Sequence, residues 1–320
     1  MTLGSEDFIR VPLPAAMITI FSAMRDPFLP RLRKTLIIGL TTASCLMLLV
    51  GCSTVRLAYD QAPTLTRWWL DGFLDFQDAQ ELPVKQGLTR WFTWHRSTQL
   101  PDYAALLARA QQEVLEPMTG GQMCAWAEDL RLRYERAVEA ALPLAAAIVP
   151  TMSSEQIAHL EDKYAKRNAD YRKKYLKPNA QERLEDALER AVDRAQTLYG
   201  KLEPAQKKLL ADQVRDNPMD AQGWYAQRLA QQRDIVDTLR RLTSEKVSSE
   251  RALITLGELK SRWVTPSRSD ATGWDQRVMR INCEALAALH NTTTPSQRRH
   301  ARDKLRGWEQ DMRALAARVP

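Results

Sequence analysis

Apolar residues recur three or four positions apart along most of this chain, and this spacing restricts the folds open to it. No stretch sustains the apolar–polar alternation that is typical of strands. One C-terminal seam suits packing between helices: Ala301, Leu305, Trp308, Met312 and Leu315. Two other faces have the same spacing: Met123, Trp126, Leu130, Tyr134, Val138 and Leu142, and Trp274, Val278, Ile281, Ala285 and Leu289. The sequence therefore predicts an all-α fold.

Proline positions divide this pattern into about nine or ten helices with short connections. Ten prolines fall at or near the expected breaks: Pro63, Pro83, Pro101, Pro117, Pro150, Pro178, Pro204, Pro218, Pro266 and Pro295. Pro143 lies inside a helical pattern and is expected to kink that helix. The chain has only 12 glycines, which also favours helix. Since no linker is long enough to force two domains, we expect one bundle-like domain.

A basic and then apolar segment precedes Cys52. Arg31, Arg33 and Lys34 come before an apolar run of about 15 residues (36–50), which is shorter than the ~20 residues of a membrane-spanning helix. The run ends in LVGC (49–52), the pattern of a bacterial lipobox. In this interpretation a signal peptidase cuts between Gly51 and Cys52, and Cys52 becomes acylated. The alternative is a single-pass anchor with an accidental cysteine.

The lipobox predicts how the chain is divided and where it is located. Residues 1–23 are interpreted as an over-called start or an extended n-region, 24–51 as a lipoprotein signal peptide, and 52–320 as the mature helical domain. Several acyl chains, at about 0.8 kcal/mol per buried methylene, would attach that domain firmly to a membrane. Ser53, in place of the aspartate that retains enterobacterial lipoproteins at the inner membrane, favours the outer membrane. We expect a lipoprotein that faces the periplasm.

Four cysteines are present, and this interpretation leaves two in the mature domain. Cys45 leaves with the signal peptide, Cys52 is acylated, and Cys124 and Cys283 remain. Two thiols in an oxidising compartment favour a disulfide. Because its loop would be long, the bond would contribute about 4–5 kcal/mol in the chain-entropy model. Two separate buried thiols are the alternative.

A short motif recurs where helices are expected to begin. It is found as MSSEQ (152–156), LEPAQ (202–206) and TTPSQ (293–297), with FQDAQ (76–80) as a degenerate copy. Ser153 or Thr294 can cap the first turn while Gln156 or Gln297 reaches back, which is a capping box. Repeated use of a good N-cap explains the motif. The alternative is a similarity to the leucine-threonine-x-x-glutamine motifs of small helical periplasmic chaperones.

No motif predicts catalysis, a metal or a cofactor. The four histidines (His95, His159, His290 and His300) form no zinc-binding pattern, and the chain has no GxSxG, P-loop or GxGxxG. The net charge of +7 is distributed among many acidic residues, so we expect no nucleic-acid partner. The sequence therefore predicts a protein without enzymatic activity.

Two local clusters have possible binding roles. The first is aromatic and follows Cys52: Trp68, Trp69, Phe73, Phe76, Trp91, Phe92 and Trp94. These side chains can form core or anchor a helix at a membrane interface, and the intervening Asp71, Asp75 and Asp78 favour core.

The second cluster is the basic segment 163–177. Its possible anionic-partner surface consists of Lys163, Lys166, Arg167, Arg172, Lys173 and Lys174. The tyrosines Tyr164, Tyr171 and Tyr175 lie close to Asn168 on one helical face. A solvated helix with these tyrosines turned inward is the favoured interpretation. Binding of phosphate or an acidic partner is the alternative.

Several segments together resemble a proteobacterial family of lipoproteins of unknown function. They are CSTVRLAYD (52–60), WWLDGF (68–73), YAKRN (164–168) and the C-terminal stretch from INCEAL to DMRAL (281–315), and the resemblance covers nearly all of 48–317. It implies an all-helical periplasmic domain behind a lipobox, with Cys124 and Cys283 at positions typical of the family. FQDAQ departs from the family's usual Leu-Thr-Pro-Glu-Gln, which weakens the first capping box. The family implies no reaction, cofactor or partner.

We therefore expect a membrane-anchored lipoprotein that acts as a non-catalytic envelope interaction protein. Its expected partners are the membrane, through the N-terminal lipid, and an envelope protein or an anionic lipid. The main alternative is a chaperone-like binder of unfolded clients, which requires a concave apolar patch rimmed by basic residues. An enzyme of unknown reaction is the third alternative.

Overall fold

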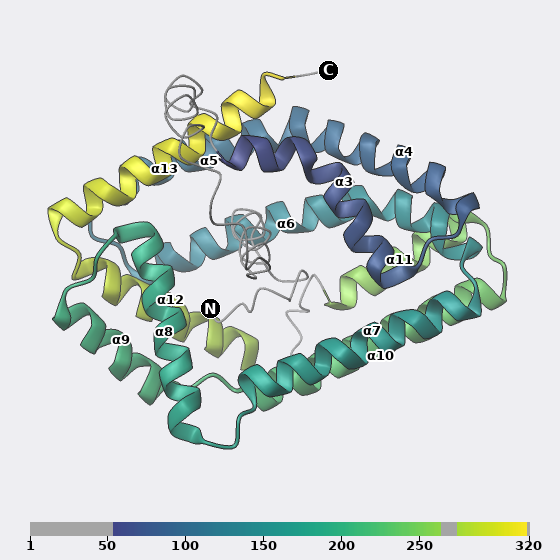
Figure 1. Ribbon diagram of the computed structural model, residues 1–320. Coiled ribbons are helices and arrows are strands. Elements are labelled where there is room, and N and C mark those ends of the chain that lie inside the picture. The colour runs from purple at the N-terminus through teal and green to yellow at the C-terminus, as the bar shows by residue number, and fades with distance from the viewer. Residues whose placement is uncertain (1–53, 264–273, 319–320) are drawn as a thin grey trace, which may run out of the picture.

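The computed structural model describes residues 54–263 and 274–318, which form helices with no strand among them (Figure 1). The predicted all-α class is confirmed. The proposed signal peptide, Cys52 and Pro266 lie outside the described residues. The elements in chain order are α3 (Thr54–Leu74), α4 (Asp78–Trp94), the π-helix η1 (His95–Gln99), α5 (Leu100–Glu113), α6 (Gly120–Ile148), the 3-10 helix η2 (Val149–Thr151), α7 (Ser154–Tyr175), α8 (Ala180–Tyr199), α9 (Pro204–Asp216), α10 (Ala221–Ser244), α11 (Ser249–Trp263), α12 (Trp274–Asn291) and α13 (Pro295–Ala316).

The helices pack mainly as antiparallel pairs. In Figure 1, α13, α5 and α4 follow one side of the molecule, and α7 and α10 follow the opposite side. Helices α8, α9 and α12 lie at one end, and α6 runs along the molecule between the two sides. Within the α7–α10 pair, Arg240 bonds to Glu161 at 2.6 Å near one end and Arg172 bonds to Tyr225 at 2.6 Å near the other. These contacts make α7 and α10 antiparallel.

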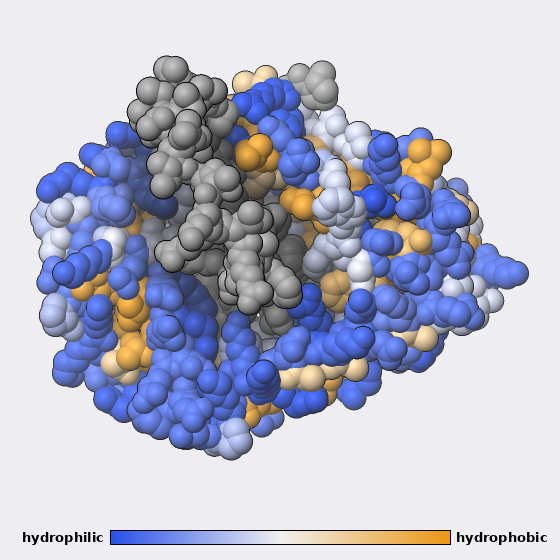
Figure 2. Space-filling view, viewed as in Figure 1, coloured by the Kyte–Doolittle hydropathy of each residue, from blue (hydrophilic) through white to orange (hydrophobic). Residues whose placement is uncertain are grey.

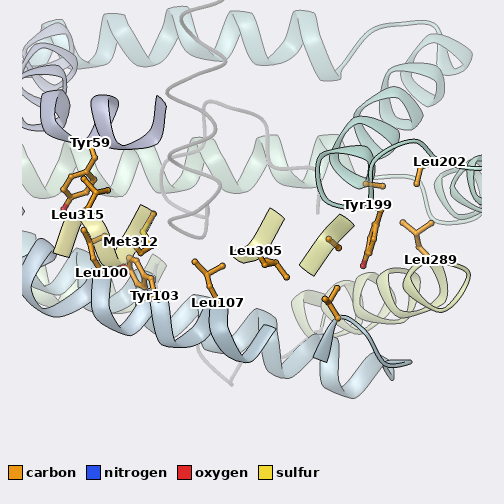
Figure 3. Close-up of a cluster of buried hydrophobic side chains, with 14 of the residues drawn as sticks. Tyr59, Leu100, Tyr103, Leu107, Tyr199, Leu202, Leu289, Leu305, Met312 and Leu315 are labelled. Atoms are coloured by element: carbon orange, nitrogen blue, oxygen red, sulfur yellow. The ribbon is translucent and has the colours of Figure 1, made fainter. Parts of the chain in front are cut away.

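The larger hydrophobic core lies where α5 and α13 pack along each other (Figure 3). It includes Leu100, Ala301 and Leu315, which are fully buried, and extends to α8 and α9 through Tyr199 and Leu202. The predicted seam of α13 supplies Ala301, Leu305, Met312 and Leu315, with Trp308 packed against the cluster. Helical spacing therefore identified the face of α13 that enters the core.

A second core joins α6, α7, α10 and α11. Its buried residues are Leu142, Ala146, Val149, Met152, Ile157, Leu160, Val236, Leu239, Leu242, Ala252 and Leu256. Met152, just before α7, and Ile157, in its first turn, are both in this cluster, so the side chains that flank the N-cap enter the same core. Leu142, on the apolar face predicted for 123–142, is buried, whereas Ile281, on the apolar face predicted for 274–289, is 41% exposed.

Capping boxes begin the helices at the recurrent motif. The Ser153 hydroxyl accepts from the backbone N–H of Gln156, and the Thr294 hydroxyl accepts from the backbone N–H of Gln297. In return, the Oε1 of each glutamine accepts from the backbone N–H of the N-cap residue of its own helix. Glu203 and Gln206 begin α9 in the same way. The degenerate copy is not weakened at its glutamine, because Gln80 Oε1 accepts from the Gln77 N–H at 3.0 Å.

The capping glutamines also pair with one another across the fold. Gln80 and Gln156 are 76 residues apart, yet the Nε2 of each donates to the Oε1 of the other, at 3.2 and 2.8 Å. Gln80 Nε2 also donates to the Thr151 carbonyl and Gln156 Nε2 to the Asp75 carbonyl. Each of these carbonyls belongs to the residue two positions before the other helix's N-cap. The pair therefore ties the start of α4 to the start of α7.

A second pair repeats this geometry at the other end of the chain. Gln206 and Gln297 exchange Nε2–Oε1 bonds of 2.8 and 2.9 Å. Gln206 Nε2 donates to the Thr292 carbonyl and Gln297 Nε2 to the Lys201 carbonyl, again two positions before each N-cap. All four glutamines are buried. We call the two pairs the glutamine junctions.

Two prolines depart from their predicted role. Pro63 lies inside α3 and Pro83 inside α4, so neither marks a break. Contacts on both sides of Pro63 hold α3, with Tyr59 in the larger core and Phe73 packed against the second. Tertiary packing thus offsets the hydrogen bond that an internal proline removes. Pro143 lies inside α6, as expected.

Candidate anionic-partner surface

Helix α7 carries all six cations of the predicted surface. Lys166, Arg172, Lys173 and Lys174 are exposed, while Lys163 and Arg167 are half-buried. Residues 163–177 contain seven Lys and Arg residues and one Asp, a net charge of +6. Among the residues that the structure describes, Lys163, Lys166, Lys173 and Lys174 form no ion pair. Their charge is therefore available to a partner.

Buried polar contacts hold α10 against this basic helix. Asn168 is 6% exposed; it donates to Gln232 Oε1 at 2.7 Å and accepts from Arg228 Nε at 2.8 Å. Both the Nδ2 and the Oδ1 of Asn168 therefore bond to side chains of α10, and Asn168 helps to position Arg228. The asparagine that the sequence placed beside the tyrosines has a structural role.

Tyrosines from α7 and α10 form a stack beneath the cations. Tyr171 packs between Tyr175 and Tyr225, with ring centres 4.8 and 5.5 Å away. Cations of three helices lie over these rings: Arg172 over Tyr225, Arg228 over Tyr171, and Lys174 and Arg190 over Tyr175. Such cation–π contacts hold positive charge at a surface without neutralising it.

The turn between α7 and α8 brings Arg190 against this stack. Lys177 forms an ion pair with Asp186 at 2.8 Å, and Arg183 donates to the Lys177 and Pro178 carbonyls. Two turns beyond Arg183 along α8, the Arg190 guanidinium carbon lies 5.1 Å from the centre of the Tyr175 ring. Arg190 therefore shares the Tyr175 ring with Lys174 of α7.

Arg190 and Tyr175 have unused hydrogen-bonding groups. Arg190 Nε and the Tyr175 hydroxyl are both buried and have no hydrogen-bond partner in the described part of the chain. Arg194 reaches solvent one turn beyond Arg190, and neither arginine forms an ion pair with another described residue. Desolvation lowers the pKa of Arg194, and the nearby charge of Arg190 lowers it further. Two like charges held together in this way would be stabilised by an anion.

The arrangement suits carboxylate or phosphate groups. Arginine guanidinium groups bind these anions through two parallel N–H donors, and lysines add unspecific attraction. We define the anionic-partner surface as the six α7 cations together with Arg190 and Arg194. The sequence does not single out the two α8 arginines, because α8 carries five acidic and three basic residues and only the fold brings Arg190 to the tyrosine stack.

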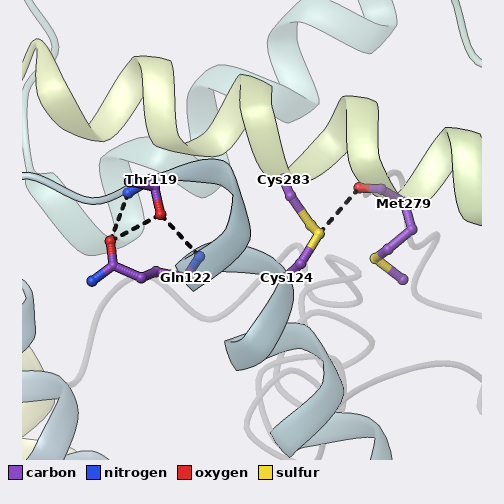
Figure 4. The surroundings of a disulfide bond; sticks show 5 residues. All are labelled: Thr119, Gln122, Cys124, Met279 and Cys283. Carbon is purple, nitrogen blue, oxygen red and sulfur yellow. Dashed lines mark hydrogen bonds between the residues drawn. A yellow bond between two sulfur atoms is a disulfide. The ribbon is translucent and has the colours of Figure 1, made fainter.

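The two cysteines predicted to pair lie at the start of α6 and in α12. Cys124 and Cys283 form a disulfide with 5.4 Å between their Cα atoms (Figure 4). The capping box of α6 is beside it, where Gln122 Oε1 accepts from the Thr119 N–H at 2.8 Å. The bond fastens α6 to α12 far from the α7 surface in sequence. We assign it a structural role.

The histidines do not gather into a metal site. His95 and His290 are buried, and each shares a hydrogen bond with a tyrosine through Nδ1, Tyr59 at 2.7 Å and Tyr199 at 2.9 Å. His290 Nε2 also bonds to the Glu116 carbonyl at 2.7 Å. Among residues 54–263 and 274–318, no group of three or more metal-binding side chains is found.

Comparisons with known proteins show the family and no more. Residues 72–266 match a family of unknown function (DUF6279), so this all-α chain belongs to that family. Searches of curated proteins and of solved structures found no match. The family description names no reaction, ligand or partner.

None of the helices that the structure describes combines the length and the apolar character that crossing a membrane requires.

Proposed function

We propose that residues 52–320 form an acylated, periplasm-facing lipoprotein of the outer membrane that binds an anionic envelope partner without catalysing a reaction. The lipobox at Gly51–Cys52 and Ser53 support the location. The anionic-partner surface supports the binding role. The predicted Cys124–Cys283 bond suits an oxidising compartment as well.

The binding role rests on one observation: several cations of α7 and α8 have no carboxylate partner. Surface arginines elsewhere in the described chain commonly have carboxylate partners, as in the pairs Arg131–Glu128, Arg215–Asp212 and Arg313–Glu309. Along α7 and α8, Lys163, Lys166, Lys173, Lys174, Arg190 and Arg194 form no ion pair with a described residue. Repulsion among these cations costs free energy that a bound anion would recover.

Charge reversal tests this role directly. We expect an Arg172→Glu/Lys173→Glu/Arg190→Glu variant to lose most cross-linked partner in a pulldown from envelope. The matched control is Lys207→Glu/Lys208→Glu, which reverses exposed cations on α9. An unchanged partner profile in the α7–α8 variant, with circular dichroism showing a folded protein, would remove the binding proposal. Vesicles with and without anionic lipid separate a lipid partner from a protein partner, and retention of unfolded clients by both variants would favour a chaperone.

The location is tested separately with Cys52→Ser. Acylation adds lipid to the thiol, so we expect the wild-type chain to fractionate with outer membrane and the variant to be released or left unprocessed. Mass spectrometry of the mature N-terminus reports the modification itself. A Cys52→Ser protein that still fractionates with membrane after processing would contradict the lipoprotein assignment.

A further inference from the structure

Helix α3 has an exposed face without charge. Leu57, Gln61, Thr64, Trp68 and Gly72 recur at helical spacing along it, and all are exposed. Leu57 is 65% and Trp68 59% exposed, and Trp69 beside them is 39% exposed. We call the five positions 57, 61, 64, 68 and 72 the α3 face. The other aromatic residues of the predicted cluster, from Phe73 to Trp94, are half-buried, so the core interpretation applies to them but not to Trp68.

The charged residues of α3 bond to neighbouring elements, away from this face. Arg56 pairs with Asp311 of α13 at 2.9 Å, and Arg67 pairs with Glu81 of α4 at 3.3 Å. Asp60 accepts from both Arg96 and Arg318. The fourth, Asp71, accepts from the Phe76 N–H at 3.0 Å. The charged side chains of α3 therefore bond toward α4 and α13, and the α3 face carries none of them.

The space-filling view shows the same contrast. Along the position of α3, pale and orange atoms follow one another, whereas α7 and α10 are largely blue (Figure 2). A Cβ added at Gly72 would meet no atom within 4 Å, so this end of the face is open. An exposed tryptophan on an uncharged helical face suits the headgroup region of a bilayer, where its apolar ring and polar N–H are both accommodated.

Other exposed apolar residues lack this setting. Ile254 of α11 is 55% exposed, nearly as much as Trp68, but Glu250, Arg251 and Glu258 are exposed one turn away and form no ion pair with a described residue. A lipid surface would have to desolvate those charges before it reached Ile254. Asp60, which is exposed one turn from Leu57 on α3, is instead paired with Arg96 and Arg318. Ile254 is therefore a matched control for the α3 face.

The chain itself brings α3 to a membrane. Helix α3 begins at Thr54, two residues after Cys52, and two residues span about 7 Å at most. Its 21 residues make a helix about 31 Å long. An acylated Cys52 would thus hold the first turn of α3 at the bilayer surface, and the α3 face is the side of the helix with no charge to oppose contact.

We propose that the α3 face lies in the headgroup region of the bilayer that holds acylated Cys52, as a second contact that orients the protein. This inference rests on the acylation in the proposed function. It assigns a lipid partner to the α3 face, which shares no residue with the anionic-partner surface. A lipid chain alone permits free rotation about the anchor, and the additional contact would present the remaining helices to the periplasm in one orientation.

Probe depth in vesicles tests the contact. The mature acylated chain carrying Thr64→Cys or Ile254→Cys is labelled with an environment-sensitive fluorophore and reconstituted into phosphatidylethanolamine–phosphatidylglycerol vesicles with nitroxide-labelled lipid. We expect the probe at position 64 to be blue-shifted and quenched several-fold more than the probe at 254. Equal quenching at the two positions would overturn the proposal.

Charge placed on the face provides the second readout. In the Thr64→Cys background, Leu57→Glu/Trp68→Glu should reduce quenching at least twofold, because the anionic surface repels the new carboxylates, while Ile254→Glu should leave it unchanged. All of these side chains are exposed, so circular dichroism should show an unchanged fold. If mass spectrometry shows no acyl group on Cys52, the proposed function fails. If Cys52 is acylated and the position 64 probe remains in water, only the α3 contact fails.

Discussion

The helix starts of this protein are joined in two different ways. Four starts are joined as two glutamine junctions, in which buried amides pair with each other and with backbone carbonyls. The start of α6 has the same kind of capping box, at Thr119 and Gln122, but Gln122 is exposed. There a disulfide two residues further along ties α6 to α12. The capping box thus occurs together with a glutamine junction at four helix starts and beside a disulfide at the fifth.

The difference teaches that the cap and the tie are separable. A capping box satisfies orphan N–H groups of its own helix and is worth about 1 kcal/mol wherever it occurs. A glutamine junction uses the remaining N–H donors of the same side chain to fix a second helix. Burial makes that use obligatory, because a buried amide without partners costs about 1–3 kcal/mol. The following changes test this distinction.

Removing the disulfide should have the largest effect. We expect Cys124→Ala/Cys283→Ala to lose about 4 kcal/mol of unfolding free energy, because the bond closes a loop of 159 residues in the unfolded chain. Urea denaturation of the variant, beside the wild-type protein with and without reductant, measures the loss. A loss below about 1 kcal/mol would mean that α6 and α12 are held mainly by their noncovalent packing.

A charge in a glutamine junction should have the next largest effect. Gln297→Glu retains the acceptor for the Thr294 N–H but cannot donate to Gln206 Oε1 or the Lys201 carbonyl. We expect a loss of about 3 kcal/mol at neutral pH, partly recovered in acid where the new carboxyl can donate. Gln122→Glu is the control and should change stability by less than about 0.5 kcal/mol, since glutamate is favourable at this position of a cap. Equal losses would show that burial of the glutamine does not matter.

How far the sequence predicts these features depends on how local they are. The capping boxes and the core seam of α13 follow from residues three or four positions apart, and the structure has both. The pairing of Gln80 with Gln156 spans 76 residues, and nothing near either residue indicates its partner. Gln122 illustrates the limit, because its local sequence favours the same cap and only the fold leaves it exposed.

The candidate surfaces divide in the same way. The α7 cations are dense enough to be recognised from their spacing. Arg190 joins them only because the turn after Tyr175 folds α8 back over the tyrosine stack. Trp68 was placed among core aromatics because the intervening aspartates made the segment resemble ordinary amphipathic helix. In the structure Arg56 and Arg67 pair with Asp311 of α13 and Glu81 of α4, an arrangement that requires knowledge of both neighbours.

Acid should weaken the protein through a buried histidine outside the glutamine junctions. Burial and, to a smaller extent, the nearby charge of Arg96 lower the pKa of His95 to about 4. The unfolded chain therefore binds a proton near pH 6.5 that the folded chain resists, so stability present above that pH is lost as the pH falls toward 4. The difference approaches about 3 kcal/mol at the lower limit.

The comparison of variants isolates this contribution. Burial also lowers the pKa of His290, but its bond to the Glu116 carbonyl opposes the shift. Between pH 6.5 and 4.5, His95→Gln should therefore remove more of the acid sensitivity than His290→Gln. Denaturant midpoints measured across this range give the slopes. Identical slopes for the wild-type and His95→Gln proteins would refute the assignment.

The smallest expected effect separates cap from tie within one junction. Thr294→Ala removes the hydroxyl that accepts from the Gln297 N–H at 3.2 Å but leaves the Gln206–Gln297 amides paired. We expect a loss of about 1 kcal/mol, close to that of Thr119→Ala at the exposed cap of α6. Thermal or urea unfolding of the two variants measures both. If Thr294→Ala instead costs as much as Gln297→Glu, the stability of the junction comes from its N-cap, and the paired amides only occupy space that the cap defines.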